Sequence, residues 1–198
     1  LLHCEIVDEV QVMRKTVVDG SNVSGFQRTM LIGMNGYIET SKGKINVDTL
    51  CLEEEAAQKI RDNEGEGVVE YNLDRLGIPL LEIATDSSIK DPEHAKECAE
   101  IIGMIIKSTG KMRRGIGTIR QDVNISIKGH PRVEIKGFQD LKNMPFTINK
   151  EIERQLEEIK SIKSKSSDNV EKELEKTVRK AEPDGSTTFL RPMPGAAR

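Results

Sequence analysis

Aromatic residues are scarce in this chain of 198 residues: they make up 3% of the sequence, and tryptophan is absent. A core must therefore be built from isoleucine, leucine, valine and methionine, and RNA recognition by stacking bases on aromatic side chains is disfavoured. The three cysteines, Cys4, Cys51 and Cys98, are scattered and form no CxxC pair. This pattern is typical of a reduced, cytoplasmic protein in which cysteine acts as a small hydrophobic residue.

Several other absences narrow the class of protein. No apolar run approaches the roughly 20 residues that a membrane-spanning helix needs, and no signal peptide is visible. The histidines are isolated, which disfavours a zinc site, and no Ser/His/Asp or Cys/His set indicates nucleophilic hydrolysis. P-loop and dinucleotide-binding motifs are missing, so a bound nucleotide would need metal and basic side chains on an open sheet. The chain has 30 basic and 33 acidic residues, which excludes a protein that binds nucleic acid through a strong overall positive charge. A local basic patch is still possible.

The first half of the chain predicts mostly strands. Residues 5–18 are expected to form one strand, and Asn35-Gly36 is the strongest short hairpin signal. Residues 53–60 are expected to begin a helix, with acidic side chains near its positive end. Further strands are predicted over residues 45–52, 68–72 and 79–85.

The second half adds two helices and two alternating strands. Asp91-Pro92 opens a clear helix that Gly110 ends, and Pro145 opens another. Residues 116–127 and 132–136 alternate apolar and polar side chains, as strands do. These elements predict an α+β fold, an antiparallel sheet with helices packed on one face and the other face open and polar. The charged tract at 161–185 is expected to be solvated and partly mobile, with a short helix at 170–180.

The hairpin over residues 118–136 is the sharpest candidate for chemistry. A three-residue loop at its tip would place Asn124 opposite Glu134 and Asp122 opposite Lys136 on one polar face. A one-residue slip would mix polar with apolar faces, which favours this register.

Arg120 and Arg132 are expected on the same polar face. Carboxylates bind Mg²⁺ and cations bind phosphate oxygens, so the face predicts a site for metal and nucleotide. The alternative is a solvent-exposed face with cross-strand salt bridges.

Three other groups of charged residues each leave two interpretations open. The cluster Glu53-Glu54-Glu55 could bind metal or could simply stabilise the start of a helix. Glu82 lies in the apolar run 80–84 and is expected to be buried, so it needs a metal or a cation such as Arg75. The basic residues before the alternating strand could contact phosphate or RNA, or form a solvated loop: Lys111, Arg113 and Arg114.

Four motifs, in this order, resemble the catalytic domain of the GatB/GatE family, whose members are subunits of tRNA-dependent amidotransferases. They are Leu52-Glu-Glu-Glu-Ala-Ala57, Tyr71-Asn…Arg75-Leu-Gly-Ile-Pro-Leu-Leu-Glu-Ile83, Arg120-Gln-Asp-Val-Asn-Ile-Ser126 and Arg132-Val-Glu-Ile-Lys136. The segments around Asp19-Gly20 and Phe189–Arg198 resemble the archaeal, E-type branch. The B-type branch usually has His at the position of Cys51 and Asp-Ala-Gly at the position of Glu55-Ala56-Ala57.

The resemblance implies a carbon–nitrogen ligase that uses ATP and Mg²⁺. It would phosphorylate the γ-carboxylate of misacylated glutamyl-tRNA(Gln), and ammonia would displace the phosphate to give glutaminyl-tRNA(Gln). An asparaginase-like D subunit would supply the ammonia within a cytoplasmic heterotetramer that contacts no membrane. The implied fold is a glutamine synthetase-like cradle domain, of which residues 1–198 would be an inactive fragment, truncated at both ends.

The family's motifs also imply roles for individual residues. Metal-ligand acids map onto Glu53, Glu54 and Glu134, with Asp122 at the acidic position of the preceding strand. The residues expected to take part in catalysis are Asp122, Glu134 and Lys136, and those expected to hold the phosphates of ATP are Arg120, Arg132 and Lys136. A family His and Glu would lie upstream of Leu1, and Glu82 with Arg75 would stiffen the floor of the site. The alternatives are a B-type subunit that also acts on aspartyl-tRNA(Asn), and a non-enzymatic tRNA-binding module.

Overall fold

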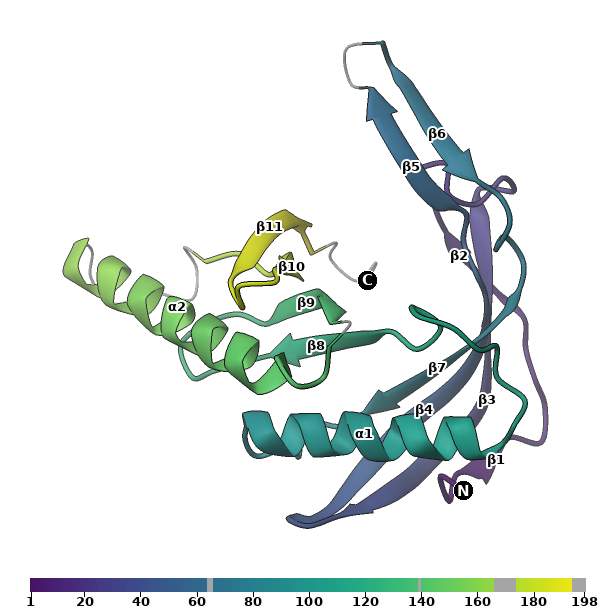
Figure 1. Ribbon diagram of the computed structural model, residues 1–198, viewed down its shortest axis with the longest axis horizontal. Helices are drawn as coiled ribbons and strands as arrows, with labels where there is room; N and C mark the ends of the chain where they lie inside the picture. The colour runs from purple at the N-terminus through teal and green to yellow at the C-terminus, as the bar shows by residue number, and fades with distance from the viewer. Residues whose placement is uncertain (64–65, 139, 166–173, 194–198) are drawn as a thin grey trace. The chain divides into compact units, whose positions relative to one another are not determined.

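The computed structural model describes residues 1–63, 66–138, 140–165 and 174–193. The chain divides into two compact units, Leu1–Ser88 and Ile89–Arg198, whose elements are labelled in Figure 1. Among the described residues, unit 1 holds a five-stranded and a two-stranded sheet, and unit 2 holds a four-stranded sheet. The two units are described separately below.

Unit 1 is built on a five-stranded antiparallel sheet. The strand order is β1-β3-β4-β7, and β2 also pairs with β3. The strands are β1 (Glu5–Ile6), β2 (Met13–Thr16), β3 (Phe26–Thr40), β4 (Gly43–Glu54) and β7 (Pro79–Thr85). The strand predicted over residues 5–18 is thus two short strands, which pair with different stretches of the same edge of β3.

The predicted hairpin at Asn35-Gly36 is wrong, because β3 runs straight through it and Gly36 pairs with Val47 on β4. The chain turns instead after Thr40, which pairs with Gly43. Gly36 is needed for close approach: a Cβ there would lie 2.5 Å from the carbonyl oxygen of Leu2. Glycine is used both in turns and in strands where another stretch of backbone passes close by, and the local sequence does not distinguish the two uses.

The helix predicted over residues 53–60 is also wrong. Glu53 and Glu54 end β4, and the next residues form β5 (Gln58–Asn63), which pairs with β6 (Val68–Asn72). Glu53 lies between Thr29 on β3 and Leu80 on β7, so pairing across the sheet overrides the local helix propensity. The strands predicted over residues 68–72 and 79–85 are confirmed, but they join different sheets.

Unit 2 packs two helices on one face of a four-stranded sheet. The strand order is β11-β10-β9-β8; β9 and β10 are parallel and the other pairs antiparallel. The elements are α1 (Pro92–Ser108), β8 (Gln121–Ile125), β9 (Val133–Phe138), α2 (Met144–Lys165), β10 (Thr177–Ala181) and β11 (Thr187–Pro192). The α+β class is confirmed.

The core of unit 2 joins the apolar face of β8 and β9 to both helices. Its buried residues are Ile125, Val133, Ile135, Phe138, Met144 and Ile148, and Ala95 and Ala99 of α1 pack against them. The helix starts are as predicted: the Asp91 side chain caps α1 by accepting from the His94 amide at 3.0 Å, and Pro145 lies in the first turn of α2. Burial raises the pKa of the Cys98 thiol in α1 to about 11, so this cysteine acts as a small hydrophobic residue.

The prediction of a short helix at 170–180 is wrong for the residues of this range that the structure describes. Residues 177–181 form β10, and Val178 is 1% exposed; residues 170–173 lie outside the described part of the chain. The sequence does not reveal this strand, because the residues around it are charged and its alternation of apolar and polar side chains is short. Among the described residues, neither helix combines the length and apolar character needed to cross a membrane.

The central position of Ile135 gives a stability prediction. Replacing this fully buried side chain by alanine should lower the free energy of local unfolding of β9 by about 2–5 kcal/mol, because a cavity replaces packed methyl groups. Hydrogen exchange of the β9 amides in the full-length protein would measure this. Ile116→Ala, at a side chain that is 98% exposed, is the control and should change little. Equal exchange in the two variants would contradict the assigned core.

Candidate active site

The polar face of the β8–β9 hairpin brings two carboxylates onto one ammonium group. Lys136 Nζ lies 2.6 Å from Asp122 Oδ2 and 2.6 Å from Glu134 Oε1. The predicted register is confirmed where Asn124 lies opposite Glu134. An irregularity between Gln121 and Val123 displaces Asp122 from a direct backbone pairing with Lys136, yet their side chains still meet.

This trio of Asp122, Glu134 and Lys136 has an electrostatic imbalance. Burial would lower the pKa of Lys136, but its hydrogen bonds to Asp122 and Glu134 raise that pKa above its ordinary value, so the ammonium form persists. Two carboxylates against one ammonium leave an excess of one negative charge. The trio can therefore accept further positive charge, as a divalent cation would provide.

The two arginines expected on this face lie at opposite ends of the hairpin. Arg120 immediately precedes β8 and Arg132 immediately precedes β9, and the two strands are antiparallel. Both side chains are exposed, and Arg132 Nη2 lies 3.1 Å from Met193 Sδ. Both arginines therefore lie at the solvent-exposed ends of the two strands.

The paired acids of unit 1 diverge from one another. Glu53 is 6% exposed; its carboxylate accepts from Thr29 Oγ1 at 2.9 Å and lies 3.8 Å from Lys15 Nζ. Glu54 forms an ion pair with Arg28 at 2.5 Å, and this hydrogen bond lowers the pKa of Glu54. Consecutive strand residues point to opposite faces, so Glu53 and Glu54 cannot both reach one metal from the same face.

The oxygen donors of unit 2 fit magnesium better. Mg²⁺ is usually held by one or two carboxylates together with substrate phosphates, and Asp122 with Glu134 meets that requirement. Among the described residues, no three His, Cys, Asp or Glu side chains form a group that could hold a metal by themselves. A metal in this place would thus depend on further ligands, such as phosphate oxygens.

The expectation that Glu82 is buried is wrong. Its side chain is exposed, because β7 is the last strand in the order of its sheet and even the neighbouring Leu81 is 53% exposed. Glu82 lies opposite Cys51, whose thiol pKa is raised by burial and by the charges of Glu82 and Glu53. Arg75 Nε is buried without a hydrogen-bond partner among the described residues.

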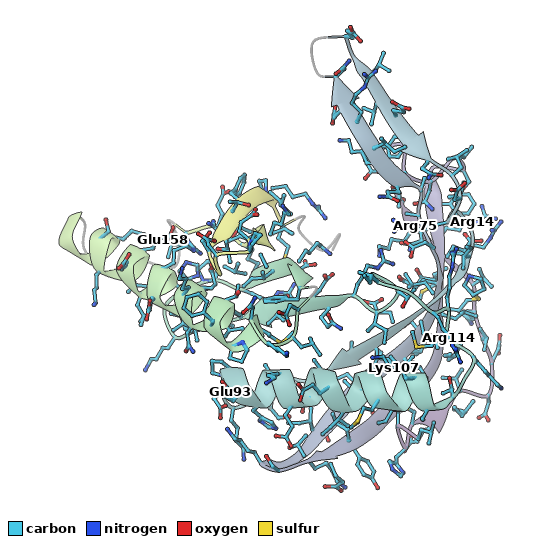
Figure 2. The ribbon with its side chains drawn as sticks, viewed as in Figure 1. Arg14, Arg75, Glu93, Lys107, Arg114 and Glu158 are labelled. Carbon is cyan, nitrogen blue, oxygen red and sulfur yellow. The ribbon has the colours of Figure 1, made fainter. Side chains whose placement is uncertain are left out.

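The basic residues after α1 lie in an exposed loop, which fits the solvated interpretation of Lys111, Arg113 and Arg114. Figure 2 labels Arg114 in this loop and Lys107 near the end of α1. Lys107 lines an open cavity of about 440 Å³ between α1 and residues 115–121.

Sequence reasoning missed a group of buried polar residues on α2. Glu151 is 1% exposed and Gln155 is fully buried. A signal for them existed, since both fall at helical spacing within the apolar stripe of Ile148, Ile152 and Ile159. A charged residue inside such a stripe indicates a buried partner.

The chain belongs to the GatB/GatE catalytic domain family, which it matches over residues 1–197. It is similar to archaeal proteins named as the E subunit of glutamyl-tRNA(Gln) amidotransferase. The identity is 59% over 156 residues with that of Methanosarcina acetivorans, covering 79% of this chain and 24% of the relative. The identity with the E subunit of Methanocaldococcus jannaschii is 56% over 160 residues, which cover 81% of this chain and 25% of the relative. The identity with that of Archaeoglobus fulgidus is 54% over 160 residues, which cover 81% of this chain and 26% of the relative. The chain thus spans about a quarter of the length of these curated relatives.

The Arg28–Glu54 pair gives a prediction about pH. Because the hydrogen bond from Arg28 lowers the pKa of Glu54, Arg28→Met should raise that pKa toward the ordinary glutamate value. In the wild type, the pair contributes its full stabilisation above the ordinary pKa of glutamate. This stabilisation is lost as the pH falls through the lowered pKa of Glu54. Carboxyl ¹³C NMR would follow the titration, with Arg113→Met as a control at an exposed arginine. An unchanged Glu54 titration in Arg28→Met would rule out this pairing.

Proposed function

We propose that the chain is part of the catalytic subunit of an ATP-dependent amidotransferase that converts glutamyl-tRNA(Gln) to glutaminyl-tRNA(Gln) in the cytoplasm. The observation that carries this proposal is the trio of Asp122, Glu134 and Lys136, which lie together on one face of a sheet in a member of the GatB/GatE family. The names of the relatives support the E-type branch and the choice of tRNA.

The proposed first step is transfer of the γ-phosphoryl group of ATP to the γ-carboxylate of the glutamyl group. A carboxylate oxygen forms the new bond to phosphorus while the bond to the β-phosphate oxygen breaks, which releases ADP. The enzyme mainly positions two anions and stabilises the charge of the transferred group. Lys136, Arg120 and Arg132 carry the positive charge for this task.

Mg²⁺ bound by Asp122 and Glu134 would supply charge neutralisation for the phosphate oxygens. Lys136 would keep the two carboxylates close together while leaving one negative charge uncompensated. In the second step, ammonia attacks the acyl phosphate and inorganic phosphate leaves, which gives the amide. We propose that an asparaginase-like D subunit supplies this ammonia.

A passive tRNA-binding module explains the trio less well. Carboxylates repel the phosphates of RNA, so a surface that only bound RNA would not present Asp122 and Glu134 together. Isothermal titration of the full-length protein with Mg-ATP separates the two functions, because a pure tRNA-binding module should give no heat. A B-type subunit would instead also convert aspartyl-tRNA(Asn).

Glu134→Gln tests the proposed function. In the full-length protein with its partner, this variant should lose about 10²- to 10³-fold or more of ATP-dependent phosphorylation of glutamyl-tRNA, because a metal-binding charge is removed without a change of shape. Transfer of ³²P from γ-labelled ATP would measure the loss, and filter binding should give unchanged tRNA affinity. Glu157→Gln, at an exposed glutamate of α2, is the control. Wild-type phosphorylation by Glu134→Gln would refute the assignment of this site.

A further inference from the structure

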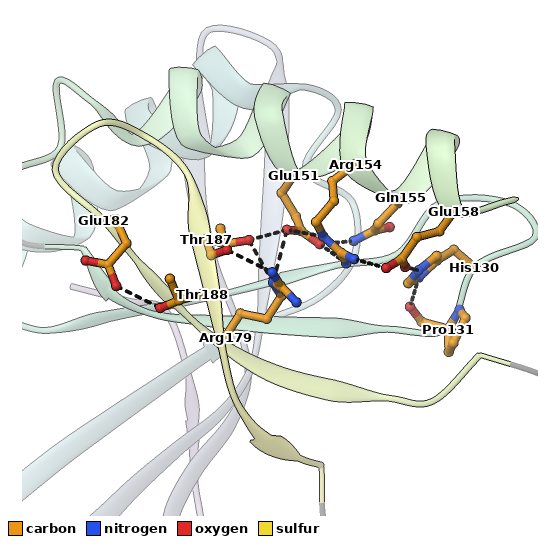
Figure 3. Close-up of polar contacts among 10 residues, drawn as sticks. All are labelled: His130, Pro131, Glu151, Arg154, Gln155, Glu158, Arg179, Glu182, Thr187 and Thr188. Carbon is orange, nitrogen blue, oxygen red and sulfur yellow. Dashed lines mark hydrogen bonds and ion pairs between the residues drawn. The ribbon is translucent and has the colours of Figure 1, made fainter. Parts of the chain in front are cut away.

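A network of buried and partly buried charged and polar side chains joins α2 to the β10–β11 hairpin (Figure 3). Glu151 is at its centre, and its carboxylate is fully hydrogen-bonded. Oε1 accepts from Arg154 Nη2 at 2.6 Å and from Gln155 Nε2 at 2.9 Å. Oε2 accepts from Arg154 Nε at 2.9 Å and from Thr187 Oγ1 at 2.6 Å.

One end of this α2 network holds strand β10 and the start of β11. Arg179 on β10 lies 3.6 Å from Glu151 Oε2 through Nε. The same guanidinium donates to Thr187 twice, at 2.7 Å to the hydroxyl and at 2.8 Å to the carbonyl oxygen. Glu151 therefore contacts both strands of the hairpin from a single helix position.

The other end of the α2 network holds the turn between β8 and β9. Arg154 Nη1 pairs with Glu158 Oε1 at 2.5 Å, and Glu158 Oε2 lies 3.0 Å from His130 Nε2. His130 Nδ1 lies 2.7 Å from the carbonyl oxygen of Pro131. Only Arg132 separates Pro131 from the first residue of β9.

Stability alone does not explain such a network. A buried ionic group costs several kcal/mol of desolvation, and apolar residues of similar volume are often as stabilising. Burial would raise the pKa of Glu151, but hydrogen bonds from Arg154, Thr187 and Gln155 lower it, so the charge is retained inside the protein. What the network adds over an apolar contact is direction, because each hydrogen bond restricts the angle as well as the distance.

The strand between the two ends of the α2 network is β9, which carries Glu134 and Lys136. Strand β10 pairs with β9 in parallel, with Arg179 opposite Ile135 and Lys180 opposite Lys136. The α2 network thus holds the residues that lead into β9 and the strand hydrogen-bonded along its edge.

We infer that Glu151 is a positioning residue for phosphoryl transfer: through Arg179, Thr187 and the Arg154–Glu158–His130 contacts it fixes β9, and with it Glu134 and Lys136. This inference rests on the function proposed above. A displacement of about 1 Å at a site that works by positioning can cost on the order of 10²-fold in rate.

The test compares four variants of the full-length protein with its partner, at a temperature at which circular dichroism finds each one folded. Glu151→Gln keeps the volume but removes the charge, and Thr187→Val removes one donor to Glu151. Thr187→Ser restores that hydroxyl. Cys98→Ala is the stability control, since Cys98 is buried on α1 and is not a member of the α2 network.

In phosphorylation assays, Glu151→Gln should lower kcat about 10-fold or more, and Thr187→Val several-fold, with the KM for glutamyl-tRNA unchanged. Thr187→Ser and Cys98→Ala should keep a kcat within about twofold of wild type. If Glu151 had only a structural role, activity would fall in proportion to stability. Cys98→Ala and Glu151→Gln proteins of equal melting temperature would then lose the same fraction of kcat.

Hydrogen exchange gives a readout that does not depend on activity. The amides of Val133–Phe138 should exchange faster in Glu151→Gln, whereas Cys98→Ala should affect α1 rather than β9. Unchanged exchange in β9, or a wild-type kcat in folded Glu151→Gln, overturns the positioning role. If wild-type enzyme phosphorylates no glutamyl-tRNA, the proposed function fails, and the exchange result still decides whether Glu151 fixes β9.

Discussion

The burial of one face of the β8–β9 hairpin against α1 and α2 is the constraint on which the candidate site depends. Ile125, Val133 and Ile135 are almost completely removed from water on that face. Because side chains alternate along a strand, this burial forces Glu134 and Lys136 to the opposite face, and a shift by one residue would bury their charges. The register that protects the core is therefore also the register that assembles the trio.

The α2 network adds a second constraint on β9, through the edge of the strand that pairs with β10. The hydrophobic effect that buries an apolar core is non-directional, so it does not by itself fix the orientation of a strand. The hydrogen bonds that Glu151 accepts from Arg154, Gln155 and Thr187 are directional, and the one from Thr187 joins α2 to a hairpin that pairs with β9. The buried carboxylate of Glu151 thus orients the strands that carry the carboxylates of Asp122 and Glu134.

Much of unit 2 could be predicted from sequence, because there the local signals and the tertiary contacts agree. The Asp91 cap, the alternation of the 118–136 hairpin and the pairing of Asn124 with Glu134 all follow from short-range patterns. Unit 1 was harder to predict. The Asn35-Gly36 dipeptide and the acidic start at Glu53 carry turn and helix signals, but long-range pairing with β4, β3 and β7 overrides both. Glu82 was placed in a buried strand, but β7 lies at the end of its sheet.

The sequence by itself determined the family and the pattern of polar and apolar positions that makes Asp122, Glu134 and Lys136 neighbours, since alternation along two adjacent strands is a local property. It did not determine that Glu53 and Glu54 face opposite ways, because that required knowing that they end a strand and not begin a helix. Only the tertiary structure decided that Glu151 reaches Arg179 and Thr187. These residues are 28 and 36 positions away in the chain, and their contact depends on how α2 packs against a hairpin that follows it.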